Sequence, residues 1–141
     1  MKKGLLYISL QFGLIAFILW RDGWLNKGGF DVLLHALGFA LGIWAIAVMR
    51  NSKLNIFPEI RKGAKVVSKG PYQKIRHPMY TAVLLYFLPF VTNSVASALA
   101  YFGLLITLIF KLNYEEKLLK KAFPNYAAYC QKTHRLLPLI Y

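Results

Sequence analysis

Arginine, histidine and tyrosine side chains lie close together where a basic segment of the chain runs into an apolar one. Arg76, His77 and Tyr80 surround Pro78 in this stretch. A proline is well tolerated in the first turn of a helix and disfavours helical geometry in the residue before it, so a helix is expected to begin near Pro78. The first turn of that helix offers unpaired backbone N–H groups that attract an anionic ligand. These residues indicate a binding site if other functional groups reach them.

A second group of reactive side chains follows about 35 residues later. It contains the paired acids Glu115 and Glu116, then Tyr126 and Tyr129 on one helical face, then Arg135. In a chain with net charge +13, paired carboxylates need a cationic partner from the protein or from a ligand. Carboxylates bind hydroxyl and ammonium groups, aromatic faces attract cations, and arginine holds a carboxylate by two parallel bonds. A reaction that needs a base would have His77 as the evident candidate.

The composition places these groups in a membrane protein. Hydrophobic residues make up 57% of the 141 residues and the mean hydropathy is +0.45, too apolar for an ordinary soluble domain. The positive charge does not indicate a nucleic-acid partner, because basic nucleic-acid modules lack several long uncharged apolar runs. The single cysteine, Cys130, excludes a disulfide framework, and no metal site is expected.

Four apolar segments predict an all-α membrane bundle in one domain. The segments cover residues 4–20, 30–49, 78–91 and 95–112, and a helical segment at the membrane interface is expected to follow over residues 113–132. No cleavage or lipidation pattern accompanies the first segment, so it is interpreted as a retained membrane helix. The third segment is short and contains Pro89, which suggests a break near its end.

Charge asymmetry predicts the orientation. All of the 18 lysines and arginines except Arg21 and Lys27 fall on one side of a four-crossing layout. The positive-inside rule then puts both termini in the cytoplasm, as in an inner or plasma membrane protein of a prokaryote. The basic central loop is expected to attract anionic membrane lipid. Gly38 and Gly42 form a G-x-x-x-G step that permits close helix packing, with an oligomer as one outcome.

This layout places the two reactive groups at the two cytoplasmic ends of one helix hairpin. Their order resembles a known motif: Gly70-Pro71-Tyr72, then Arg76-His77-Pro78-x-Tyr80, then Glu115-Glu116 with Tyr126, Tyr129 and Arg135-x-x-Pro138. The pattern is similar to that of the isoprenylcysteine carboxyl methyltransferase family, a group that includes the phospholipid N-methyltransferases. The resemblance covers residues 51–138, and both halves of the motif flank a hairpin of suitable length.

The resemblance implies an S-adenosylmethionine-dependent methyltransferase that acts on a lipophilic or membrane-delivered acceptor, whose carboxylate, thiol or amine takes the methyl group at the cytoplasmic face. Cytosolic carboxyl-terminal elements would close over the cofactor. The expected catalytic residues are His77, Glu116 and Arg135, with Arg135 facing the acceptor or locking the carboxyl-terminal segment. The expected cofactor-binding residues are Tyr72, Arg76, His77, Pro78, Tyr80, Glu115, Glu116, Tyr126 and Tyr129.

Two other functions remain open from the sequence. Membrane sterol reductases have a related carboxyl-terminal organisation and use a nicotinamide cofactor, although they are much larger bundles. A noncatalytic protein would use the G-x-x-x-G helix for assembly and the basic loop to bind lipid or a partner.

Overall fold

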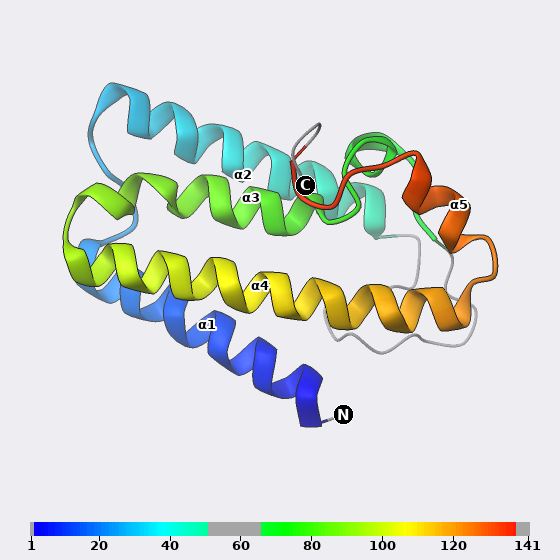
Figure 1. Cartoon of the computed structure of the whole chain (residues 1–141). Helices are drawn as coiled ribbons and strands as arrows, with labels where there is room; N and C mark the ends of the chain where they lie inside the picture. The colour runs from blue at the N-terminus through cyan, green and yellow to red at the C-terminus, as the bar shows by residue number, and fades with distance from the viewer. Residues whose placement is uncertain (1, 51–65, 138–141) are drawn as a thin grey trace.

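Antiparallel helices form most of the described chain, as Figure 1 shows for the computed structural model, which describes residues 2–50 and 66–137. No strand forms within these two ranges, and the expected all-α fold is confirmed. Residues 51–65 of the predicted basic loop and Pro138 of the motif lie outside the described residues. The elements are α1 (Lys2–Asp22), α2 (Gly29–Met49), the 3-10 helix η1 (Gly70–Gln73), α3 (Pro78–Phe87), the 3-10 helix η2 (Leu88–Thr92), α4 (Val95–Ala122) and α5 (Tyr126–Gln131).

The apolar segments form helices at the places that the sequence indicates. Helices α1, α2 and α4 are long and apolar enough to cross a membrane, whereas Pro78–Thr92 is a shorter apolar helix. The third segment changes from α to 3-10 geometry at Leu88, just before Pro89. This is the predicted break, since a proline lacks the backbone N–H that would continue the α-helix.

Helix α4 is longer than the predicted fourth span. We expected the span to end at Leu112 and a separate interfacial helix to follow, but α4 continues to Ala122 and only the short α5 comes after it. The change to charged residues after Leu112 marks a change of surroundings, not a helix end, because glutamate, lysine and leucine are good helix formers. The helix stops at Phe123, whose extended backbone is the geometry favoured before Pro124.

Two helix pairs build the bundle: α2 packs on α3, and α1 packs on α4. Gly38 makes the first pair possible, since a Cβ atom there would lie 2.7 Å from the backbone nitrogen of Tyr86. Gly42 faces Ala82 of the same helix α3. The close approach predicted from the G-x-x-x-G step is therefore made within one chain, and α3 covers the face that we had considered for an oligomer.

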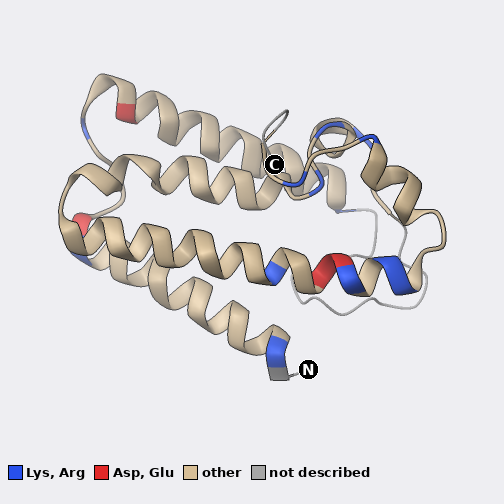
Figure 2. Ribbon diagram, in the orientation of Figure 1, with Lys and Arg blue, Asp and Glu red and all other residues tan. Residues whose placement is uncertain are grey.

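The outer surface of the bundle suits a lipid environment. Large apolar side chains are exposed along α1, α2 and the apolar part of α4, including Trp20 at 82% and Phe30 at 70%. With three helices long enough to cross, this makes the chain an integral membrane protein. Figure 2 shows that the charged residues of α4 gather in its carboxyl-terminal part, at the end of the bundle where α5 lies. The apolar part of the helix precedes them.

Candidate active site

A carboxyl-terminal strap, residues 132–137, completes the site by pairing with the segment before α3. The Arg76 amide donates to the His134 carbonyl at 2.7 Å, and the His134 amide donates to the Lys74 carbonyl at 2.9 Å. Farther on, the Thr81 hydroxyl donates to the Leu136 carbonyl at 2.6 Å. The strap is thus held by backbone bonds along residues 74–77 and by the side chain of Thr81, and no local sequence pattern encodes these contacts.

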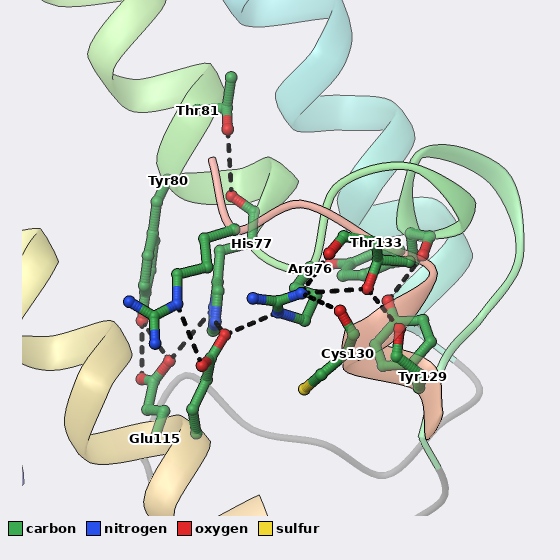
Figure 3. Close-up of polar contacts among 11 residues, drawn as sticks. Arg76, His77, Tyr80, Thr81, Glu115, Tyr129, Cys130 and Thr133 are labelled. Carbon is green, nitrogen blue, oxygen red and sulfur yellow. Dashed lines mark hydrogen bonds and ion pairs between the residues drawn. The ribbon is translucent and has the colours of Figure 1, made fainter. Parts of the chain in front are cut away.

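The Arg76 guanidinium connects the strap to α4. Its Nε donates to Glu116 Oε1 at 2.7 Å, while Nη1 donates to the Cys130 carbonyl at 3.0 Å and to the Thr133 carbonyl (Figure 3). From the strap, Arg135 Nε lies 3.3 Å from Glu116 Oε2. Glu116 is only 2% exposed, and each of its oxygens has an arginine partner. The predicted catalytic pair of Glu116 and Arg135 therefore forms an ion pair that fastens the strap to the hairpin.

The other glutamate forms a cluster with an aromatic pair. The Tyr80 hydroxyl donates to Glu115 Oε1 and Oε2 at 2.6 and 2.7 Å (Figure 3). The His77 ring stacks on the Tyr80 ring at a centroid distance of 5.3 Å and an angle of 8°. His77 Nδ1 lies 3.8 Å from Glu115 Oε2, and Nε2 lies 3.4 Å from Glu116 Oε1. Nε2 is buried, and the Glu116 carboxylate is its polar neighbour.

Three tyrosines, Tyr72, Tyr126 and Tyr129, lie in or between η1 and α5, and one of them links the two elements. The Tyr129 hydroxyl donates to the Tyr72 carbonyl at 2.6 Å. Burial raises the pKa of Tyr129 to about 12, although the nearby Arg76 acts in the opposite direction. Burial also raises the pKa of Tyr72 and of Tyr126. The buried Tyr72 hydroxyl itself finds no partner in the described part of the chain, so it retains a donor for a ligand.

A cavity of about 270 Å³ opens between α1, α3, α4 and η1. Five predicted site residues line it: Tyr72, Arg76, His77, Tyr80 and Glu115. The other five do not line the cavity: Pro78, Glu116, Tyr126, Tyr129 and Arg135. The remaining walls are mostly apolar, formed by Phe12, Ile15, Met49, Met79 and Val83, with Gln11 and Lys111 as their polar members.

Gln11 and Lys111 line the cavity, and the sequence reasoning did not include them in the candidate site. We assigned the site to residues 51–138 and thus left out α1, and we used Lys111 only as a topology charge. Lys111 Nζ donates to Gln11 Oε1 at 2.9 Å across the cavity wall. Polar side chains within apolar spans are a recognised sign of function, and this signal pointed to both residues.

Comparisons with known proteins identify relatives of this chain. A family model described as phospholipid methyltransferase matches residues 29–126. The chain is also similar to the cobalt-zinc-cadmium resistance protein CzcN of Cupriavidus metallidurans, with 30% identity over 123 residues. This match covers 84% of the chain and 53% of the relative, so the chain spans about half the length of the curated relative that it matches. No solved structure matches the chain.

Proposed function

The chain belongs to the phospholipid methyltransferase family, and from this premise we propose that it transfers a methyl group from S-adenosylmethionine to a lipophilic acceptor at the cytoplasmic membrane face. One observation carries the proposal. The cluster of His77, Tyr80 and Glu115 stands in the wall of a cavity whose remaining walls are mostly apolar and come largely from membrane helices. Such a cavity suits a polar cofactor at one end and an apolar acceptor along its length.

The groups that line the cavity fit the cofactor. S-adenosylmethionine supplies a methyl group bound to a positively charged sulfur, together with an ammonium group, a carboxylate and ribose hydroxyls. Glu115 would hold the ammonium group or the hydroxyls, and the rings of Tyr72 and Tyr80 would attract the sulfonium by about 1 kcal/mol. Arg76 Nη2 has no partner in the described ranges, so this nitrogen is available for the carboxylate. The Tyr72 hydroxyl, which has no hydrogen-bond partner in the described part of the chain, offers a further polar contact.

The chain's own contribution is orientation and exclusion of water. Tyr80 fixes the Glu115 carboxylate by bonds to both of its oxygens, so the negative charge stays at one place in the wall. Apolar side chains such as Ile15 and Val83 keep the rest of the cavity dry. A positioned carboxylate in a dry cavity acts more strongly on a cation than it would in water. An amine acceptor would also require a base, for which His77 is placed beside the cluster.

Glu116 and Arg135 act through the strap in this proposal. Both Glu116 oxygens are engaged by Arg76 and Arg135, which leaves Glu116 as a positioning residue. Of the two roles expected for Arg135, the ion pair supports the one that locks the carboxyl-terminal segment. The strap then keeps Arg76 and His77 in place, since both amides donate to strap carbonyls.

Calorimetric binding of S-adenosylhomocysteine, the demethylated cofactor, tests the proposal on purified protein in a neutral detergent. We expect binding to wild-type protein and at least about tenfold weaker binding to Glu115→Gln, which keeps the size of the side chain but removes its charge. Lys117→Met, an exposed position on the same helix, is the matched control and should bind like wild type. Binding of a reduced nicotinamide instead would indicate a reductase. A folded sample that binds neither compound would indicate a noncatalytic protein.

A further inference from the structure

A lysine is buried in the apolar part of the cavity wall. Lys111 is 2% exposed and stands one helical turn before Glu115 on α4. Its ammonium donates to Gln11 Oε1 at 2.9 Å and lies 5.0 Å from the centroid of the Tyr80 ring. Gln11, which comes from α1, is itself only 8% exposed. The two side chains form a polar pair at a place where lipid-facing helices meet.

The positive charge of Lys111 has no carboxylate in direct contact within the described ranges. The Glu115 carboxylate, one helical turn away, attracts the ammonium without forming an ion pair with it, and its two oxygens accept from Tyr80. An ammonium carries more N–H donors than its one bond to Gln11 uses. Burial of a cation without a paired anion is costly, and functional sites are where membrane proteins retain such groups.

The conformation of Lys111 argues against a role in topology alone. A lysine at the end of the apolar part of a membrane helix normally extends its chain to place the ammonium in the aqueous interface. The ammonium here turns inward to α1 and the Tyr80 ring, although exposed positions such as Lys117 exist on the same helix. The amine is thereby presented at the cavity that Gln11, Tyr80 and Lys111 all line.

We propose that Lys111 and Gln11 bind the anionic group of an amphiphilic acceptor, a carboxylate or a phosphate monoester, whose hydrocarbon chain lies against the apolar walls. The inference rests on the proposed function and defines the acceptor class for the same cavity. Lys111 supplies the charge and Gln11 orients the ammonium and offers its amide N–H groups. Phe12, Ile15 and Val83 contact the apolar chain. A cationic lipid amine is disfavoured at this place by the like charge of Lys111.

Native mass spectrometry tests the proposal with defined probes. The protein is placed in phosphatidylcholine nanodiscs that contain equal mole fractions of dodecanoate, dodecyl phosphate, dodecan-1-ol or dodecylamine, and the bound amphiphile is counted after release. We expect wild-type protein to retain one of the two anions about tenfold more than the alcohol or the amine. The anion that is retained in the larger amount shows whether the site prefers a carboxylate or a phosphate.

Substitutions then assign the effect to the polar pair. Lys111→Met, similar in length and uncharged, should reduce retention of the anion to the level of the alcohol, whereas Lys117→Met should leave it unchanged. Gln11→Leu keeps the positive charge of Lys111, and we expect it to lose part of the anion retention. This variant also tests the proposal if Lys111→Met does not fold. Equal retention of anion and alcohol by wild type, or full retention by a folded Lys111→Met or Gln11→Leu variant, would overturn the proposal. Binding of S-adenosylhomocysteine to wild type is measured separately, so this inference and the proposed function fail independently.

Discussion

At the scale of single residues, Arg76 determines how firmly the strap is held. One guanidinium bonds to Glu116 on α4 and to two carbonyls, those of Cys130 and Thr133. Lysine keeps the charge but lacks the planar fork that makes these bonds together. We expect Arg76→Lys to lower the free energy of strap opening by about 2 kcal/mol, as for the loss of hydrogen bonds to a charged group.

Hydrogen exchange of the His134 amide measures this effect, because that amide donates to the Lys74 carbonyl and is released when the strap opens. The exchange rate should rise in Arg76→Lys. Lys74→Met is the control, since the Lys74 side chain is exposed and its carbonyl is kept. Equal protection of His134 in wild type and Arg76→Lys would show that the backbone bonds alone hold the strap.

The thiol of Cys130 reports on the same region through its pH dependence. Burial raises the pKa of this thiol, and the nearby Arg76 only partly offsets that effect. A raised pKa means less reactive thiolate at neutral pH. The maleimide labelling rate of Cys130, the single cysteine, should therefore increase with pH up to a higher midpoint in folded protein than in the denatured chain. A midpoint at or below that of the denatured chain would contradict the prediction.

At the scale of elements, the α2–α3 contact depends on one glycine. A Cβ atom at Gly38 would lie 2.7 Å from the Tyr86 nitrogen and 2.9 Å from the Ala82 carbonyl oxygen, and neither backbone can move without separating the helices. At Gly42 the nearest atom would be the Ala82 Cβ at 3.6 Å, an ordinary contact. We expect Gly38→Ala to destabilise the protein by about 2 kcal/mol, and Gly42→Ala to have little effect. Thermal unfolding in detergent compares them, and equal midpoints would contradict the prediction.

The positions of the helices could be predicted from the sequence, because an apolar segment in a membrane must pair its own backbone N–H and C=O groups by forming a helix. The end of α4 could not be predicted in the same way. Hydropathy shows where the apolar surroundings end, but residues 113–122 remain helical beyond that point. The meeting of the two hairpin ends was predicted and is confirmed by the Tyr80–Glu115 and Arg76–Glu116 bonds. The contact of Gln11 with the cavity was not predicted. Its bond to Lys111 joins residues 100 positions apart and depends on how α1 packs against α4.

At the scale of the whole molecule, the bundle has two chemically different ends. The cluster around Glu115 and the strap lie at one end. At the other end, Asn26 of the α1–α2 connection donates to Asn93 of the η2–α4 connection at 3.0 Å. The charge distribution of the sequence predicts that the first end faces the cytoplasm. The proposed reaction would then draw its soluble cofactor from the cytoplasm and its acceptor from the lipid around the helices.

Labelling of single cysteines with a membrane-impermeant maleimide tests this orientation. In a Cys130→Ala background, Lys132→Cys marks the site end and Lys27→Cys the opposite end, and both lysines are exposed. We expect Lys27→Cys to react in intact cells and Lys132→Cys only in inverted membrane vesicles. Reaction of both positions from one face would contradict the crossing pattern of the helices. The reverse assignment would keep the bundle but place the Glu115 cluster outside the cytoplasm, and the proposed reaction would lose its cofactor supply.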